Sequence, residues 1–207
     1  MFYVVKTPAF IRQAFPDAWW RLEYPADHVY LTFDDGPTQE VTPWVLDALD
    51  AADAKATFFL QGSQVEKHPG IALEILNRGH AVGHHGYAHL NAWKTKTDVF
   101  LTDIGKGASL TPSPLFRPPY GKLTPDLYRS LKHQYQVVLW DVMPGDFDKG
   151  KSAVKCLKDA LRHTQSGSIV VLHDNAKSFP KLKEMLPDYL AGLKEKGFRL
   201  AALPQPA

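Results

Sequence analysis

Two neighbouring aspartates, Asp34 and Asp35, follow an apolar run in the segment YLTFDDGPT, residues 30–38. Adjacent side chains of an extended strand point in opposite directions, so both carboxylates reach one site only if the backbone turns, and Gly36-Pro37 supplies such a turn. One carboxylate could then bind a metal ion while the other serves as a base. An acidic turn cap would also explain this tripeptide in isolation, but not the histidines and the arginine further along the chain.

Histidines are concentrated in GHAVGHHGYAHLNAW, residues 79–93, which holds four of the nine in the chain. His85 and His89 are four positions apart, so on one helical turn both rings would face the same way and could share a metal ion. An isolated pair of this kind is more often a surface or packing feature. With a carboxylate from another strand end, however, it forms the ligand set of an open catalytic site. A structural zinc site would require a fourth protein ligand, and the single cysteine, Cys156, is not placed to provide one.

Two further groups could serve this chemistry, Arg117 in FRPPYG and His173 in IVVLHDN. Arg117 could be a surface charge, but a guanidinium beside a carboxylate would lower the pKa of that carboxylate and fix its direction. His173 could be a buried core histidine, but its place at a strand end favours a general acid. Asp146 in WDVMPGDFD could keep His173 protonated, because a nearby carboxylate favours the imidazolium. Spacing alone does not exclude the other candidates for this partner, Asp141, Asp148 and Asp174.

Short β-branched and aromatic runs alternate with longer helical patterns along the chain. The runs predict seven strands, at residues 28–33, 55–60, 80–85, 114–119, 135–140, 167–173 and 197–203. The clearest helix has Thr42 as its N-cap and Pro43 at its first position. Other helices are expected to begin near Pro69, Asp98, Thr124, Lys151 and Pro180. Such alternation predicts a parallel sheet with right-handed crossovers, either closed into a barrel or open and doubly wound.

The candidate side chains all follow the C-terminal ends of predicted strands. The aspartate pair follows the first strand and the two histidines follow the third, while Arg117 ends the fourth, Asp146 follows the fifth and His173 ends the sixth. In parallel α/β folds these ends share one rim, where binding sites are built. Residues nearly 140 positions apart are therefore expected to converge in one cleft.

Length and composition favour one domain spanning residues 1–207, with 44% hydrophobic residues and 24 basic against 22 acidic side chains. The charges are nearly balanced and form no basic stripe, so nucleic-acid binding is not expected. We expect no transmembrane segment, no signal peptide and a monomer, with localisation cytoplasmic or unassigned. Residues 1–27 are rich in aromatics and could form a membrane-surface helix, but an N-terminal extension packed on the barrel is the better interpretation.

Five motifs together resemble the polysaccharide deacetylases of carbohydrate esterase family four, also called the NodB homology domain. They are TFDDGP, HGYAH, RPPYG, GDF after WDV, and VVLH, and they occur in the family's order between residues 32 and 173. The flanking sequence resembles short, leaderless bacterial members, so the resemblance covers nearly the whole chain. It implies an α/β fold, a distorted (β/α) barrel of about seven parallel strands, in a single domain.

The resemblance also implies residue roles at the metal. Asp34 would be the catalytic base, and Asp35, His85 and His89 would hold one divalent cation. Arg117 would orient Asp34. Zinc is the expected metal, although Co²⁺, Ni²⁺ or Mn²⁺ could occupy this ligand set.

The remaining roles concern the substrate. The backbone N–H of Tyr120 would stabilise the oxyanion, His173 would be the general acid and Asp146 would tune it. Leu172 and Trp140 would line a small pocket for the acetyl methyl group. The candidate stacking surfaces for sugar rings, each also a plausible core residue, are Tyr87, Tyr120, Trp140 and Phe147.

Three positions depart from the family pattern. Gly86 stands where Ser or Thr is usual, which removes a hydroxyl expected to brace the second motif. His84 replaces a frequent Asn and could be a second donor or an alternative ligand. Phe147 replaces the common Trp of the fourth motif, which keeps an aromatic wall but gives up an indole donor.

The expected function is hydrolytic removal of N-acetyl groups from N-acetylglucosamine-containing oligo- or polysaccharides, with release of acetate. One alternative is a deacylase of a non-sugar amide or ester, because the same metal site serves any small acyl group. A carbohydrate-binding module with a decayed site is a third possibility, against which the complete set of site residues counts.

Overall fold

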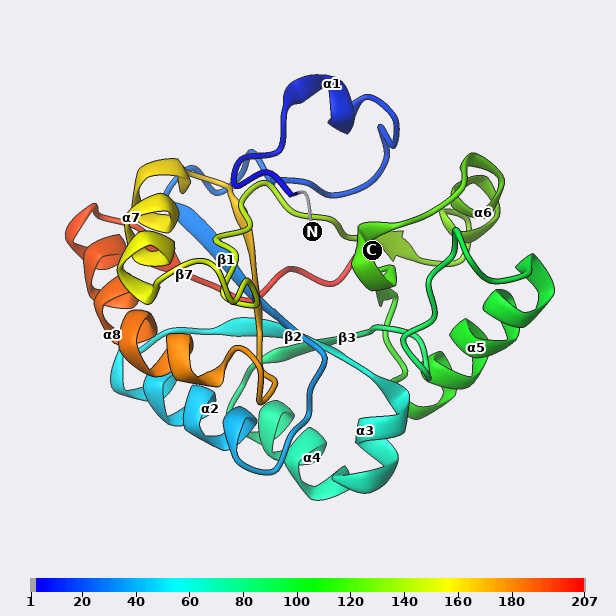
Figure 1. Cartoon of the computed structure of the whole chain (residues 1–207), viewed down its shortest axis with the longest axis horizontal. Helices are drawn as coiled ribbons and strands as arrows, with labels where there is room; N and C mark the ends of the chain where they lie inside the picture. The colour runs from blue at the N-terminus through cyan, green and yellow to red at the C-terminus, as the bar shows by residue number, and fades with distance from the viewer. Residues whose placement is uncertain (1–2, 207) are drawn as a thin grey trace.

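The computed structural model describes residues 3–206, in which seven strands pair in parallel in one curled sheet (Figure 1). Their order is β5-β4-β3-β2-β1-β6, and β7 pairs with the beginning of β1. This confirms a distorted (β/α) barrel of seven parallel strands. The strands are β1 (His28–Asp34), β2 (Ala56–Leu60), β3 (Ala81–His84), β4 (Leu115–Phe116), β5 (Gln136–Val137), β6 (Ile169–His173) and β7 (Arg199–Leu200).

The helices form an arc around the outside of the sheet, as Figure 1 shows for α2 to α8. A large apolar cluster lies between them and the outward-facing residues of β1, β2 and β6, which include Phe33 and Leu172. Since strand side chains alternate, the next residues along, Asp34 and His173, face the barrel interior. The helices are α1 (Ala9–Arg12), α2 (Val41–Ala51), α3 (Gly62–Lys67), α4 (Pro69–Asn77), α5 (Thr97–Leu110), α6 (Pro125–Leu131), α7 (Ala153–His163) and α8 (Phe179–Glu195), with a 3₁₀ turn η1 (Pro119–Gly121).

A second layer of apolar side chains fills the barrel interior below the site. It contains Tyr30 from β1, Phe59 from β2, Leu115 from β4 and Ile169 from β6. The C-terminal segment contributes Leu203, whose backbone N–H donates to Thr57 Oγ1 at 2.8 Å. These buried side chains form the floor beneath the rim at the carboxyl ends of the strands, where the binding sites of such folds are built.

The sheet does not close by direct pairing of β5 with β6 in the described residues. Residues of the N-terminal segment lie between them: Trp19 forms a bridge to Val138, and Arg21 forms one to Ser168. Further along, Val142 bridges directly to Val170 of β6. The two sides of the gap are thus joined by isolated bridges and not by a continuous ladder.

Several element boundaries differ from the expectations. Helix α2 begins at Val41, so Thr42 lies inside it and is not the N-cap; the Thr42 hydroxyl accepts from the Thr38 N–H and donates to the Asp174 carboxylate. The strands expected at 114–119, 135–140 and 197–203 are reduced to the two-residue strands β4, β5 and β7. Pro118 and Pro119 explain the first case, because proline has no N–H for a ladder. Helix α3 was not expected, and the short helix α1 lies in the N-terminal segment, for which a helix was the less favoured interpretation.

Among the described residues, no helix combines the length and the apolar character that crossing a bilayer requires.

Candidate active site

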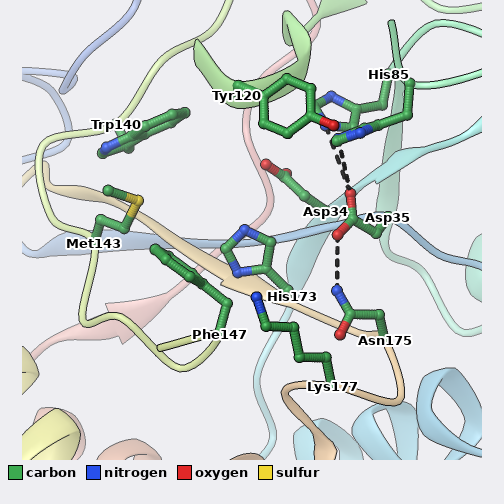
Figure 2. Close-up of a pocket in the computed structure, with 11 residues that line it drawn as sticks. Asp34, Asp35, His85, Tyr120, Trp140, Met143, Phe147, His173, Asn175 and Lys177 are labelled. Carbon is green, nitrogen blue, oxygen red and sulfur yellow. Dashed lines mark hydrogen bonds and ion pairs between the residues drawn. The ribbon is translucent and has the colours of Figure 1, made fainter. Parts of the chain in front are cut away.

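The carboxyl ends of the strands surround a cavity to which β1, β6 and the loops after β3, β4, β5 and β6 all contribute (Figure 2). The register of the sheet places Asp34 of β1 directly opposite His173 of β6. The lining residues are Asp34, Asp35, His85, His89, Tyr120, Trp140, Met143, Phe147, His173, Asn175 and Lys177. The predicted convergence of distant segments at one rim is therefore observed.

Asp35, His85 and His89 form a compact group of potential metal ligands. One atom from each lies within 4.8 Å of the other two. Oδ1 of Asp35 is 3.2 Å from His89 Nε2 and 3.8 Å from His85 Nε2. One carboxylate and two imidazoles suit a divalent cation such as zinc and leave further coordination positions for water and substrate.

The His85 ring is held in the tautomer that a metal ligand needs. Its Nδ1 lies 2.7 Å from the Arg117 carbonyl oxygen. A carbonyl can only accept, so Nδ1 carries the proton and the Nε2 lone pair points toward Asp35. Burial is the main cause that lowers the pKa of His85 to about 4, which keeps the ring neutral.

Asp35 is correspondingly held in its ionised form. Burial would raise its pKa, but the contact with His89 and the nearby His173 and His85 outweigh burial and hold the pKa well below its usual range. Asn175 Nδ2 donates to Asp35 Oδ2 at 2.7 Å, which leaves Oδ1 directed at the two imidazoles (Figure 2). The carboxylate is therefore fixed from both sides.

Asp34 is oriented by a fully buried arginine. Arg117 Nη1 donates to Asp34 Oδ1 at 2.7 Å and to Thr32 Oγ1 at 2.6 Å, and its other nitrogens donate to the carbonyls of Val138 and Leu139. Its guanidinium also stacks over Phe59, 4.1 Å from the ring centre. The Arg117 side chain therefore has little rotational freedom. Its guanidinium fixes the direction of the Asp34 carboxylate.

His173 is paired with Asp146, which selects one candidate from the four that spacing left open. Asp146 accepts from the His173 backbone N–H at 2.8 Å, and its other oxygen lies 3.0 Å from His173 Nδ1. Burial alone would lower the pKa of His173, but Asp146, with smaller contributions from Asp35 and Asp34, raises it to about 9. The imidazolium is thus the stable form at neutral pH.

The other three aspartates are engaged elsewhere. Asp141 is buried beside Lys6 and Ser168, and Asp148 accepts from the Tyr3 hydroxyl. Asp174 accepts from the Gly36 N–H and from the Thr42 hydroxyl. Burial, the largest cause, raises the pKa of Asp174 to about 7. These contacts support the turn that follows Asp35.

Backbone conformation is unusual at the site. Of the four non-glycine residues with positive φ in residues 3–206, three line the cavity: Asp35 (80°), His89 (56°) and Tyr120 (61°). The left-handed conformation at Asp35 turns its side chain toward the same cavity as Asp34. Such residues cost about 1–3 kcal/mol each and cluster at functional sites.

The loop that carries His89 is not the helical turn expected from the HxxxH spacing, since no helix spans residues 85–96. Asp103 of α5 holds it instead, accepting from the backbone N–H of Tyr87 at 2.9 Å and of Ala88 at 2.8 Å. The brace expected to be missing at Gly86 is therefore supplied by Asp103. Gly86 itself has φ of 69°, and a Cβ there would lie 2.7 Å from Asp103 Oδ2.

Two predicted substrate contacts are absent from the described cavity. Leu172 is fully buried in the outer core, because it faces away from the interior that its neighbour His173 faces. Tyr87 lies outside the lining, where its hydroxyl donates to Glu66 and Lys106 covers its ring. Of the predicted substrate contacts, Tyr120, Trp140 and Phe147 do line the cavity.

His84 lies away from the potential metal ligands. It is fully buried, stacked on Phe116 at 4.8 Å and edge-on to Tyr135. Burial lowers its pKa to about 3, and neither ring nitrogen has a hydrogen-bond partner among the described residues. Since strand residues alternate, His84 and His85 face opposite sides, so His84 is neither an alternative ligand nor a donor to the site.

Three lining residues were missed by sequence reasoning: Met143, Asn175 and Lys177. The rule that located the other candidates, proximity to a strand's carboxyl end, applies to the NAK tripeptide after His173 as well. The contact of Asn175 with Asp35 joins residues 140 positions apart, and the sequence carried no periodic signal for it.

Comparisons with known proteins agree on one family. The model of the family "Polysaccharide deacetylase" matches residues 21–138. A peptidoglycan-N-acetylglucosamine deacetylase of Bacillus cereus is 35% identical over 193 residues, which cover 87% of this chain and 68% of that protein. Asp146 and His173 lie beyond the family match, so their alignment depends on such longer relatives.

Two solved structures extend the comparison. The Bc1960 peptidoglycan N-acetylglucosamine deacetylase, in complex with 4-naphthalen-1-yl-N-oxidanyl-benzamide, has a TM-score of 0.87 at 32% identity, covering 96% of this chain and 95% of its own. A CE4 family pseudoenzyme from Bacillus anthracis has a TM-score of 0.77 at 26% identity, covering 89% of this chain and 66% of its own. The same fold thus occurs with and without activity, and the side chains of the site must carry the functional argument.

Proposed function

Because this chain belongs to the polysaccharide deacetylase family, whose enzymes are metal-dependent hydrolases, we propose that it removes N-acetyl groups from N-acetylglucosamine-containing glycans and releases acetate. The observation that carries the proposal is the arrangement around one cavity. A three-residue ligand group lies beside an aspartate oriented by Arg117 and a histidine kept protonated by Asp146, two residues that are register partners on β1 and β6. These are the base and the acid that amide hydrolysis needs.

Asp35, His85 and His89 would hold the metal ion. When bound, the ion supplies Lewis-acid polarisation of the acyl oxygen and makes water a stronger nucleophile. Asp35 is ionised and His85 neutral before any ion arrives, which are the protonation states that ligands require. Zinc suits this ligand set, and cobalt, nickel or manganese are the alternatives to compare.

Asp34 would accept the proton of the attacking water. Its contact with Arg117 keeps one carboxylate oxygen occupied and directs the other toward the cavity. The Tyr120 N–H donates no hydrogen bond to any other described residue. It is therefore free to donate to the developing oxyanion, a contact worth roughly 3–4 kcal/mol in comparable sites.

His173 would protonate the departing sugar nitrogen, which otherwise leaves as an unstable amide anion. Figure 2 shows Trp140, Met143 and Phe147 on the side of the cavity opposite Asp35. We assign Trp140 and Met143 to the acetyl methyl group, since Leu172 is not available for it. Phe147 and Tyr120 would contact the sugar rings.

A substrate panel tests the proposal. Acetate release is measured from N-acetylglucosamine oligomers, peptidoglycan fragments, acetylated polyamines and aryl acetates, with and without a chelator. We expect chelator-sensitive release from the glycans. Preferential release from the polyamines or aryl acetates would favour a non-sugar deacylase, and glycan binding without any release would favour a decayed binding module.

A further inference from the structure

Lys177 lies at the mouth of the cavity, in the loop between β6 and α8, and is exposed. Figure 2 shows its side chain extending toward Phe147 and His173. Its ammonium lies 5.4 Å from the centre of the Phe147 ring. The face of the Phe147 ring attracts the Lys177 ammonium and so favours its position at the cavity. At this distance the contact is too long to immobilise the side chain.

The other charged side chains at the site have partners. Asp34 is paired with Arg117, and His173 with Asp146. Lys181, on the first turns of α8, donates to the carbonyls of Asp146 and Asp148. By contrast, no carboxylate among residues 3–206 lies within ion-pair distance of Lys177. No polar group of residues 3–206 accepts a hydrogen bond from the Lys177 ammonium.

The unpaired charge has a consequence for ligands. With a divalent cation bound, the Asp35 carboxylate would balance only half of its charge, and the Asp34–Arg117 and Asp146–His173 pairs are each neutral, so Lys177 would add to a cavity that is already positive. A positive cavity raises the local concentration of anionic ligands and speeds their association. Neutral N-acetylglucosamine oligomers would gain nothing from it.

The position of Lys177 indicates which part of a substrate it would meet. It lies next to His173, the residue that would protonate the sugar nitrogen, and not next to Trp140 and Met143 on the acetyl side. We propose that Lys177 binds a carboxylate carried by the glycan near the reacting acetamide, and that it selects acidic peptidoglycan fragments over neutral N-acetylglucosamine oligomers. This inference rests on the proposed deacetylase function.

Two sources of that carboxylate exist in peptidoglycan, the lactyl ether of its muramic acid units and the attached stem peptide. Three matched substrates separate them: glycan fragments with free lactyl carboxylates, the same fragments with the lactyl groups converted to methylamides, and fragments with stem peptides. Neutral N-acetylglucosamine oligomers of equal length complete the set. The quantity compared is the ratio of kcat/KM for each acidic substrate to that for the neutral oligomer.

The variants are Lys177→Met, which removes the charge, and Lys177→Glu, which reverses it. Lys183→Met is the matched control, because Lys183 is exposed and lies 4.3 Å from the centre of the Phe179 ring but does not line the cavity. We expect Lys177→Met to lower the ratio about fivefold, mainly through KM, and Lys177→Glu to lower it further. The effect should shrink as salt is added. Lys183→Met should leave the ratio unchanged.

An equal ratio of kcat/KM values in wild type and both Lys177 variants would overturn the assignment. It would also be overturned if the wild type showed the same ratio for fragments with free and with amidated lactyl groups and if stem peptides had no effect on the ratio. If the wild type released acetate from no glycan, the proposed function would fail instead. Calorimetric binding of the same acidic and neutral fragments to wild type and Lys177→Met would then decide the anion site on its own.

Discussion

Arg117 Nη1 lies 2.7 Å from Asp34 Oδ1, in a pair that is almost completely removed from solvent. The same nitrogen donates to Thr32 Oγ1, two residues before Asp34 on the same face of β1. Arg117 thus connects the base to its own strand and to the carbonyls of residues 138 and 139 across the barrel. The orientation of the proposed base is a property of the barrel interior and not of the DDG turn alone.

This relationship predicts the effect of Arg117→Lys. Lysine cannot reproduce the planar fork of donors, so Asp34 loses its fixed direction and acetate release should fall about 100-fold. Thr32→Val, which keeps the side-chain shape and removes one partner of Arg117, should give a smaller loss. Metal content and thermal melting are measured alongside. Full activity in Arg117→Lys would show that Asp34 needs no such orientation.

The pH dependence follows from the His173–Asp146 pair. A general acid must be protonated, and the pKa of His173 is raised to about 9, so activity should persist at neutral pH and fall as the pH rises through about 9. Asp146→Asn removes the carboxylate and should move this alkaline limb about one to three pH units lower. Asp148→Asn is the control, since Asp148 accepts from Tyr3 instead. An unshifted limb in Asp146→Asn would exclude His173 as the group observed.

Asn175 should contribute to metal affinity without being a ligand. Its amide donates to Asp35 Oδ2, and its own oxygen accepts from the Ser178 N–H at 3.0 Å, so its orientation is fixed. Asn175→Ala should weaken zinc binding about 10- to 100-fold, as measured by competition with a fluorescent chelator. Asn91→Ala removes an amide whose one hydrogen bond within residues 3–206 is the one that it accepts from the Trp93 N–H, and it should leave the affinity unchanged. Equal affinities in both variants would assign Asn175 no part in holding Asp35.

Restoring the hydroxyl residue that is usual in the family at position 86 should be harmful here. Gly86→Ser would place a Cβ at positive φ and against Asp103, with a loss of about 1–3 kcal/mol in the free energy of unfolding. Gly105→Ser in α5 is the matched control, because a Cβ there meets no atom within 4 Å. Urea unfolding measures both. Unchanged stability in Gly86→Ser would show that the loop can rearrange away from Asp103.

The sequence was informative where a local pattern has one structural outcome. Alternating runs predicted seven strands, and the rule that parallel strands share a rim brought Asp34, His85 and His173 to one cavity. The sequence did not predict contacts between side chains that the fold brings together. The HxxxH spacing suggested a helical turn, yet the loop conformation depends on two backbone hydrogen bonds to Asp103 of the next helix, α5, and on the positive φ at His89.

Side-chain direction was the other source of error. Leu172 and His173 are neighbours, but alternation along β6 sends one to the outer core and the other to the cavity. Four aspartates were candidates for the partner of His173. The path of the chain after β5 decides that Asp146 is the one that contacts it. Asp141 turns toward Lys6 of the N-terminal segment, a partner 135 residues away that no spacing rule identifies.

The central claim is that Asp35, His85 and His89 hold a catalytic metal ion beside a separate base. It is tested most directly by measuring bound metal and acetate release together in Asp34→Asn and His89→Ala. Asp34→Asn should retain wild-type metal content and lose turnover, whereas His89→Ala should lose both. Full turnover in Asp34→Asn, or undiminished metal in His89→Ala, would contradict the account.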